Sequence, residues 1–353
     1  MLILTPEELR LHLPNHAYDE IESMSGAFRR SEADVLKEIV GQPLYAEMVR
    51  RYNHADLGEM VHWLLQMNGP DPWAEIIYLS QQVIVFDAFM RNADINAISI
   101  NQSGINVVSA ENYDAASKDG IAAYKKQLNK ELHAATNRLL VWLEELEKEQ
   151  GAMSMEQEES DVEDESDVTD SQLEIVTLWK QSKYYYLIAD LFIHTATTFN
   201  RYVDIYDSRE KFINLLPDLR VCQRQYIENE LGDTLTADLL QKSMNGTGNS
   251  KEKKAIEKIQ EALALCVEAR SKYFDRKAAR DESIGSIARM TEYIRWNILD
   301  FDPTAAQSFP DYATAKEHAE ERNTMAQAPT PPPSEPWQNN RPGNAMLVMP
   351  ALY

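Results

Sequence analysis

The fold of this chain depends on two stretches of its sequence, RRSEADVLKEIVGQPL at residues 29–44 and RVCQRQYIENELGDTL at residues 220–235. Each has the pattern of a helix that ends in a glycine, with a leucine three residues later. A loop and a long helical segment follow each stretch. We therefore expect two similar helical halves that arose by a diverged duplication, although few residues are identical and independent helix-stop signals would look the same.

Further helix signals surround the first stretch. Thr5 can cap a helix that begins at Pro6, and Glu8 stands where a capping box requires an acidic residue. Residues 56–67 and 72–90 are predicted to form two more helices, because a turn-forming Asn-Gly-Pro-Asp-Pro segment separates them. The first half is therefore predicted to be a helical bundle.

One segment of the first half has the period of a strand. Between residues 97 and 108, isoleucine and valine alternate with polar residues on both sides of Gly104, which predicts a small β-hairpin arm that includes Ile105. A long amphipathic helix follows over residues 117–149. The predicted fold class is therefore mainly α, with two helical-bundle halves of which the first carries the hairpin.

Changes of composition divide the chain into four predicted parts. Nine acidic residues and no Lys or Arg stand between residues 156 and 170, and such self-repulsion keeps a segment extended. The predicted parts are a first helical domain at 1–150, an acidic flexible linker at 151–172, a second helical domain at 173–315 and a Pro-rich tail with an apolar end at 316–353. Two apolar runs in the second domain, 184–188 and 202–206, fit either a strand or a buried helix.

The tail combines a proline-rich spacer with an apolar end. Residues 329–337 favour an extended polyproline conformation, and the last nine residues are mostly apolar. Such a segment suits docking into a groove or sheet edge of another subunit, and folding back on its own domain is the alternative. The residues that we expect to contact a partner are Gly104, Ile105, Trp337, Met346, Leu347, Val348, Met349, Leu352 and Tyr353.

Charge and cysteine content exclude several classes of protein. The 353 residues carry a formal net charge of −22, which opposes binding to nucleic acid and to anionic lipid. Cys222 and Cys266 are the only cysteines and lack the spacing of a metal site. The first residues do not resemble a secretion signal, and no apolar run approaches the ~20 residues that a membrane span needs. We therefore expect that the protein is not secreted, does not associate with a membrane and does not bind nucleic acid in a sequence-specific way.

Motifs for catalysis are weak. His62 stands three residues after Glu59, as in one half of a di-metal site, but a second such pair is missing. His12 and His16 are separated by Pro14, which breaks the helix that would align them. The glycine-rich residues 245–251 lack the order of a phosphate loop. We therefore expect no enzyme, no cofactor and no metal site.

The first half resembles the opening of tailed-phage head-to-tail connector proteins. The resemblance lies in residues 4–13, in the Ala/Glu-rich helix that ends at Gly41 and in Leu44–Tyr45. The resemblance extends to the 98–108 hairpin and the long helix after it. The first half is similar in particular to the larger connector-like proteins of phages and prophages of Bacteroidetes. In that family a small helical bundle with a hairpin or loop arm forms a ring beneath the portal, and a C-terminal segment docks on a neighbouring component.

The resemblance implies a virion structural protein, a ring subunit that bridges the portal and the tail components. Its partners would be other copies of itself and portal, tail or neck proteins, and it would assemble in the cytoplasm of the bacterial host. The sequence departs from the family in its two bundles, where typical connectors have one. Two alternatives stay open: a cytosolic helical adaptor that binds peptides or partner helices, and a metal-dependent enzyme with a dispersed site using Glu59 and His62.

The acidic stretch leads to a first prediction. Because residues 151–170 have few apolar groups to offset the entropy of ordering, limited proteolysis should cut there before it cuts other loops. Mass spectrometry of the first fragments identifies the site. Resistance of the stretch under conditions that cleave other loops would indicate a packed segment.

Overall fold

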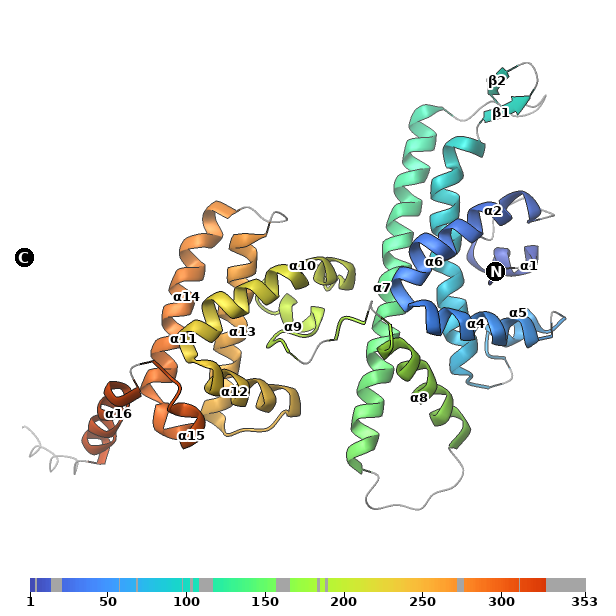
Figure 1. The fold of residues 1–353 in the computed structure, drawn as a ribbon. Helices are drawn as coiled ribbons and strands as arrows, with labels where there is room; N and C mark the ends of the chain where they lie inside the picture. Colours follow the sequence, from blue (N-terminus) through green and yellow to red (C-terminus); the bar gives the residue numbers. More distant parts are fainter. Residues whose placement is uncertain are drawn as a thin grey trace, which may run out of the picture. The chain divides into compact units, whose positions relative to one another are not determined.

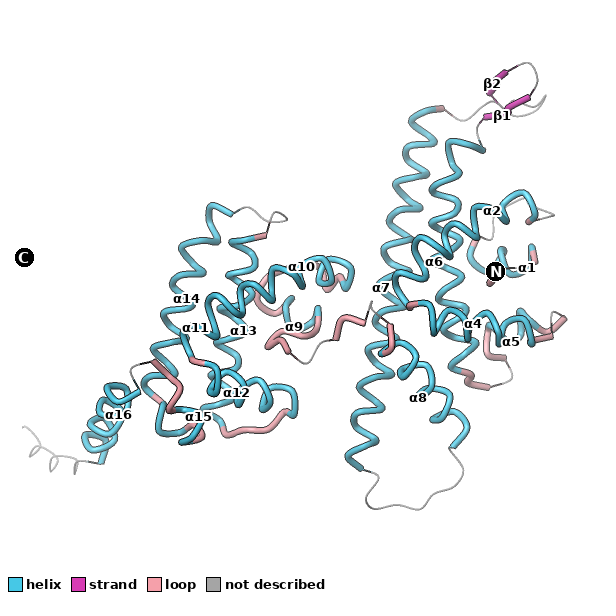
Figure 2. Tube along the Cα trace, in the orientation of Figure 1, coloured by secondary structure: helices cyan, strands magenta, loops and turns pink. Residues whose placement is uncertain are grey.

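A computed structural model gives the structure of the chain, which divides into two compact units, unit 1 at Met1–Leu219 and unit 2 at Arg220–Tyr353. Each unit is mainly α-helical, as predicted (Figures 1 and 2). The structure describes all residues except 4, 14–20, 57, 68, 97, 102–103, 108–116, 157–165, 183–184, 188–189, 272–275, 311 and 328–353. None of the helices within the described residues is long and apolar enough to span a bilayer.

Unit 1 is built around one buried helix. Its elements are α1 (Pro6–His12), α2 (Glu22–Ser31), the π-helical turn η1 (Glu32–Leu36), α3 (Lys37–Val40), α4 (Gln42–His54), α5 (Met60–Leu64), α6 (Pro72–Asn96), β1 (Ile98–Asn101), β2 (Gly104–Val107), α7 (Lys118–Glu156), α8 (Ser166–Lys180), α9 (Ala196–Asn200) and α10 (Arg209–Cys222), which contains the unit boundary. Helix α6 contacts α1, α2, α4, α5, α7 and α8. Such surroundings require apolar residues on all sides of the helix, and Trp73, Ile77 and Phe89 are among those buried.

The first helix begins where the sequence predicts. The Thr5 N–H donates to Glu8 Oε2 at 2.8 Å, and the Glu8 N–H donates to Thr5 Oγ1 at 3.3 Å. The capping box is therefore complete, with Pro6 at the first helical position. The prediction of this helix start is confirmed.

Strands β1 and β2 pair antiparallel, with Ile98 opposite Val107 and Asn101 opposite Gly104. The two residues that connect them, 102 and 103, lie outside the described residues. The hairpin arm as a functional element, with Gly104 at its turn and Ile105 exposed to a partner, therefore stays a prediction.

Unit 1 extends further along the chain than the first predicted domain. Helices α7 and α8 contact each other, although α7 ends and α8 begins inside the predicted linker at 151–172. The chain after α8 returns to α7, where the Tyr186 hydroxyl donates to Glu144 Oε1 at 2.6 Å. The boundary between the two units falls within α10, between Leu219 and Arg220, and the residues that return to α7 belong to unit 1.

The structure describes residues 185–187 and 202–206 of the two apolar runs. These residues form neither a strand nor a helix. Residues 202–206 form irregular turns in which the Asn200 side chain accepts the N–H groups of Ile205 and Asp207, at 2.8 and 3.1 Å. The amide oxygen replaces the hydrogen bonds that a helix or strand would have supplied. The apolar side chains Val203 and Ile205 are nevertheless buried.

Unit 2 centres on a pair of long helices that pack side by side, α13 (Ser250–Arg270) and α14 (Arg276–Trp296) (Figure 1). Asn249 caps α13 with a capping box to Glu252, which gives the glycine-rich residues 245–251 a structural role as a helix connection. The remaining elements are the π-helical turn η2 (Gln223–Glu228), α11 (Asn229–Leu231), α12 (Asp233–Asn245), the 3₁₀ turn η3 (Ile298–Asp300), α15 (Pro303–Ala306) and α16 (Tyr312–Gln327). Helix α16 continues beyond residue 315, where the tail was predicted to begin.

The two stretches that predict the fold have the same local structure. Gly41 has φ 83° and ψ 160°, and Gly232 has φ 79° and ψ 156°. Each follows a π-helical turn and a short α-helix, and each precedes a helix of 13 residues, α4 or α12. A Cβ atom on Gly41 would overlap the Ser182 hydroxyl, and one on Gly232 would overlap the backbone oxygen of Ser308.

Buried side chains recur every fourth residue before both glycines. The two series are Met24, Phe28, Glu32, Leu36 and Val40, and Leu215, Leu219, Gln223, Ile227 and Leu231, all of them buried. Each series has a polar residue in its middle and ends one residue before the glycine. The two segments thus match in spacing, in burial and in the position of the polar side chain.

The glycine geometry predicts the effect of two substitutions. Gly232→Ala should destabilise the protein by roughly 2 kcal/mol or more, because φ is positive and the obstructing atom belongs to the backbone. Gly41→Ala should also be destabilising, because φ is positive there as well and the Oγ and Cβ atoms of Ser182 would lie only 2.1 and 2.4 Å from the added Cβ. Chemical denaturation measures both changes.

Gly26→Ala is the matched control, since Gly26 lies in α2 with open space around the added Cβ. It should be neutral or stabilise the helix by about 0.5–1 kcal/mol. A Gly232→Ala variant as stable as the control would contradict the constraint at this turn.

Candidate functional site

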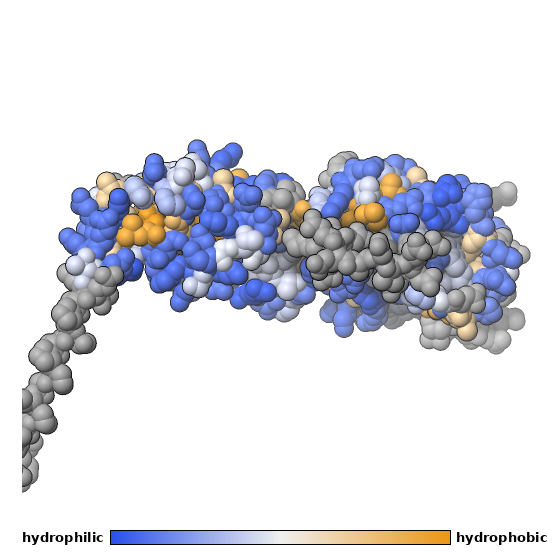
Figure 3. Space-filling view, turned by 90° about the horizontal axis from the view of Figure 1, so that it is seen from below, coloured by the Kyte–Doolittle hydropathy of each residue, from blue (hydrophilic) through white to orange (hydrophobic). Residues whose placement is uncertain are grey.

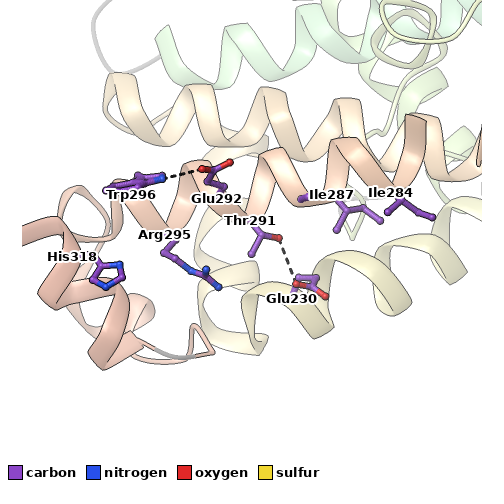
Figure 4. Close-up of a pocket in the computed structure, with 9 residues that line it drawn as sticks. Glu230, Ile284, Ile287, Thr291, Glu292, Arg295, Trp296 and His318 are labelled. Carbon is purple, nitrogen blue, oxygen red and sulfur yellow. Dashed lines mark hydrogen bonds between the residues drawn. The ribbon is translucent and has the colours of Figure 1, made fainter. Parts of the chain in front are cut away.

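The described part of unit 2 contains a groove of about 540 Å³ beside α14. Its floor is α14, which contributes Ile284, Ile287 and Trp296, and its walls are Glu230 of α11 and His318 of α16 (Figure 4). This volume is in the range of ligand pockets, which is about 300–1,000 Å³. The groove therefore has room for several side chains.

The floor of the groove is apolar although it faces solvent. Ile284 is 59% exposed and Trp296 is 41% exposed, while most large apolar side chains of the unit are buried. Residues 284, 287, 288, 291 and 295 line the groove at the spacing of one helix face. Figure 3 shows apolar residues gathered in one area on the otherwise largely hydrophilic surface of the left-hand lobe. Contiguous exposed apolar surface of this kind is typical of an interaction site.

Polar groups stand at the edges of the groove. The Trp296 indole N–H donates to Glu292 Oε1 at 3.3 Å, and its ring lies 6.5 Å from that of His318. The Thr291 hydroxyl donates to Glu230 Oε2 at 3.5 Å (Figure 4). Arg295 is exposed and makes no ion pair within the described part of the chain. An apolar floor with one free cation at its edge is suited to an apolar peptide that carries a negative charge.

Unit 1 contains a buried polar network that holds the beginning of the chain. Glu32 Oε1 accepts the Leu2 N–H at 2.6 Å, and Glu32 Oε2 accepts the Tyr45 hydroxyl at 3.1 Å. Gln81 donates to the Leu2 carbonyl oxygen at 2.5 Å and to Glu8 Oε1 at 3.1 Å. These bonds satisfy two carboxylates that would be costly to bury alone. The network is structural, because its groups are occupied by one another.

His12 belongs to the same network and is buried. Its Nε2–H donates to Gln81 Oε1 at 3.1 Å, because the amide nitrogen of Gln81 already donates elsewhere. Its Nδ1 has no hydrogen-bond partner within the described residues. Burial lowers the pKa of His12 to about 4, although the hydrogen bond to Gln81 acts in the opposite direction. The side chain is therefore neutral at physiological pH.

A second buried network fastens the chain after α8 to α7. Arg209 Nη2 lies 3.0 Å from Glu144 Oε2, and the two side chains are 5% and 1% exposed. Arg209 Nη1 also contacts Asp207 Oδ2 at 2.7 Å, and the Tyr186 hydroxyl binds the other oxygen of Glu144. Burial, together with the nearby Glu144 charge, raises the pKa of Tyr186. Removing one partner of such a pair typically costs about 3–5 kcal/mol, so this contact is a structural element of unit 1.

The residues predicted to bind a partner are mostly outside the described part of the chain. Trp337 and the apolar residues from Met346 to Tyr353 lie in the segment 328–353, and only the backbone of Gly104 and Ile105 is described. The groove itself was missed in the sequence. A signal was available in the sequence, since the apolar residues Ile284 and Trp296 stand in a stretch that also contains many charged residues.

The weak metal motifs are not assembled into a site. Glu59 is the N-cap of α5 and His62 lies within it, and both are exposed. Within the described residues no three His, Cys, Asp or Glu side chains are grouped so as to hold a metal ion. His12 is hydrogen-bonded to Gln81, and His16 lies outside the described residues.

Part of unit 1 is similar to other proteins in sequence. Residues 36–149 match the model of a family described as a family of unknown function, DUF6712. The match covers α4–α6 and most of α7, with Gly41 near its start. Neither the curated proteins nor the solved structures contain a match to this chain.

The burial of His12 predicts a pH effect on stability. Because the pKa of His12 is about 4 in the folded chain and ordinarily 6.5, as in the unfolded chain, its contribution to stability is full above pH 6.5 and is lost as the pH falls towards 4. The loss should reach about 3 kcal/mol. His12→Gln should show a smaller fall in unfolding free energy than the wild type between pH 7 and pH 4.

The matched control is His54→Gln, at an exposed position of α4. Its stability should follow the wild-type pH profile. A His12→Gln profile that also follows the wild type would show that His12 does not titrate in the folded chain as inferred.

Proposed function

We propose that this chain is a virion structural protein, a subunit of a head-to-tail connector ring that bridges portal and tail components. The observation that carries the proposal is the repeated helix–glycine–helix structure, whose first copy coincides with the residues of the connector resemblance. The capped first helix at Thr5–Glu8 adds to this support. The partners would be other copies of the chain and portal, tail or neck proteins.

The two halves would be diverged copies of one ancestral unit. In support, Gly41 and Gly232 have nearly the same backbone angles, each is approached by a serine from a later segment, and the two buried series coincide when they are aligned on the glycines. Independent helix-stop signals would not require the same π-helical turn at the same distance from the glycine. A duplicated unit would let one chain make two similar contacts with its neighbours.

A cytosolic helical adaptor is the second candidate, because the groove on α14 favours it. An exposed stripe of apolar residues along one helix face is the type of surface that binds peptides or amphipathic helices. In this case the chain would bind its partner as a single copy.

Assembly state distinguishes the two candidates. If the chain is a connector, the purified chain, alone and mixed with the products of its neighbouring genes, should form closed rings whose mass is a whole multiple of the chain mass. Light scattering after size-exclusion chromatography gives the mass, and negative-stain electron microscopy shows ring closure.

Gly104→Val, which alters the predicted arm, provides a variant for the same measurement. A chain that stays monomeric with all these partners, yet binds a peptide through the groove, would contradict the connector proposal and support the adaptor.

A further inference from the structure

The groove on α14 exposes apolar surface that an isolated chain would benefit from covering. Ile284, Ile287 and Trp296 form a floor to which the described residues supply walls but no cover. Complete burial of one large apolar side chain makes the free energy of binding more favourable by about 1.5–3 kcal/mol. The occupant should therefore be apolar, narrow enough for about 540 Å³ and available wherever the protein is.

The end of this chain has that chemistry. Residues 345–353, AMLVMPALY, contain no charged side chain in a chain whose net charge is −22. Within residues 328–353, Glu335 and Arg341 are the only charged side chains, so the side chains of the segment carry no net charge. It can thus approach an acidic protein with little repulsion.

The segment begins at the helix that forms one wall of the groove. Helix α16 carries His318 in the wall and ends at Gln327. The spacer of residues 328–344 can extend roughly 50 Å at about 3 Å per residue. The whole of α14, with 21 residues, is about 30 Å long. Residues 345–353 can therefore reach every part of the groove within the same molecule, at an effective concentration on the order of millimolar.

We propose that the segment Ala345–Tyr353 docks in the groove of its own unit 2, along Ile284, Ile287 and Trp296. The contact forms in the isolated chain and does not depend on ring assembly. It gives the groove an internal ligand, with which any external peptide or helix has to compete.

Photocrosslinking in the full-length chain tests this contact. Ile284→benzoylphenylalanine places the probe in the groove, and Met244→benzoylphenylalanine is the matched control on α12, where Met244 is 38% exposed and does not line the groove. The Ile284 probe should crosslink to peptides from residues 343–353, and the Met244 probe should not. Mixing isotopically heavy and light chains should give heavy–heavy and light–light products, because the contact is intramolecular.

A double variant completes the test. Leu347→Asp with Leu352→Asp should remove the crosslink from the Ile284 probe while the circular dichroism spectrum stays helical. Absence of tail peptides from the Ile284 crosslinks, or equal crosslinking from Met244, would overturn the proposal. Heavy–light products would overturn the intramolecular contact and place the segment on a second copy.

Discussion

The folding of both helical units depends on a steric constraint, the close passage of a serine segment against a glycine with positive φ. At Gly232 the backbone oxygen of Ser308 occupies the space of a side chain, and at Gly41 the hydroxyl of Ser182 does so. The glycine lets the chain turn sharply between two helices, and its missing Cβ lets a later segment close over the turn. Leu235 shows this closure, since its N–H donates to the Ser308 hydroxyl at 2.9 Å. Local turn geometry and long-range packing are therefore fixed by the same residue.

The sequence predicted those parts of the fold that depend on local signals. The capping box at Thr5 and Glu8, the glycine stops and the long helices before and after the hairpin are all set by neighbouring residues, and periodicity and turn chemistry reveal them. The contacts of Tyr186 and Arg209 with α7 could not be predicted in this way. They depend on Glu144 meeting Arg209 and Tyr186, which are distant in sequence, and scattered charges in so acidic a chain give no indication of pairing.

The groove on α14 could be predicted from the sequence only in part. Its floor was visible as apolar residues on a charged helix, but their exposure follows from the placement of α11 and α16 beside α14, which no local pattern gives. The buried carboxylates Glu8 and Glu32 illustrate the same limit. Both read as ordinary surface residues in the sequence, and only the structure shows that they hold the first residues of the chain against α4 and α6.

The π-helical turns have a consequence for how distant relatives of this chain could be recognised. In an α-helix, residues four apart in sequence differ by about 40° in direction around the helix axis. A series of five such residues would therefore rotate by about 160° in total, and its last members would no longer face the core. The wider turns η1 and η2 take up this drift, which keeps a strict period of four buried on one side across the turn. A search for helices with a 3.6-residue period would overlook such segments. A profile that instead requires four apolar positions at multiples of four, a buried polar residue in their centre and a glycine directly after the last would select this architecture from sequence alone.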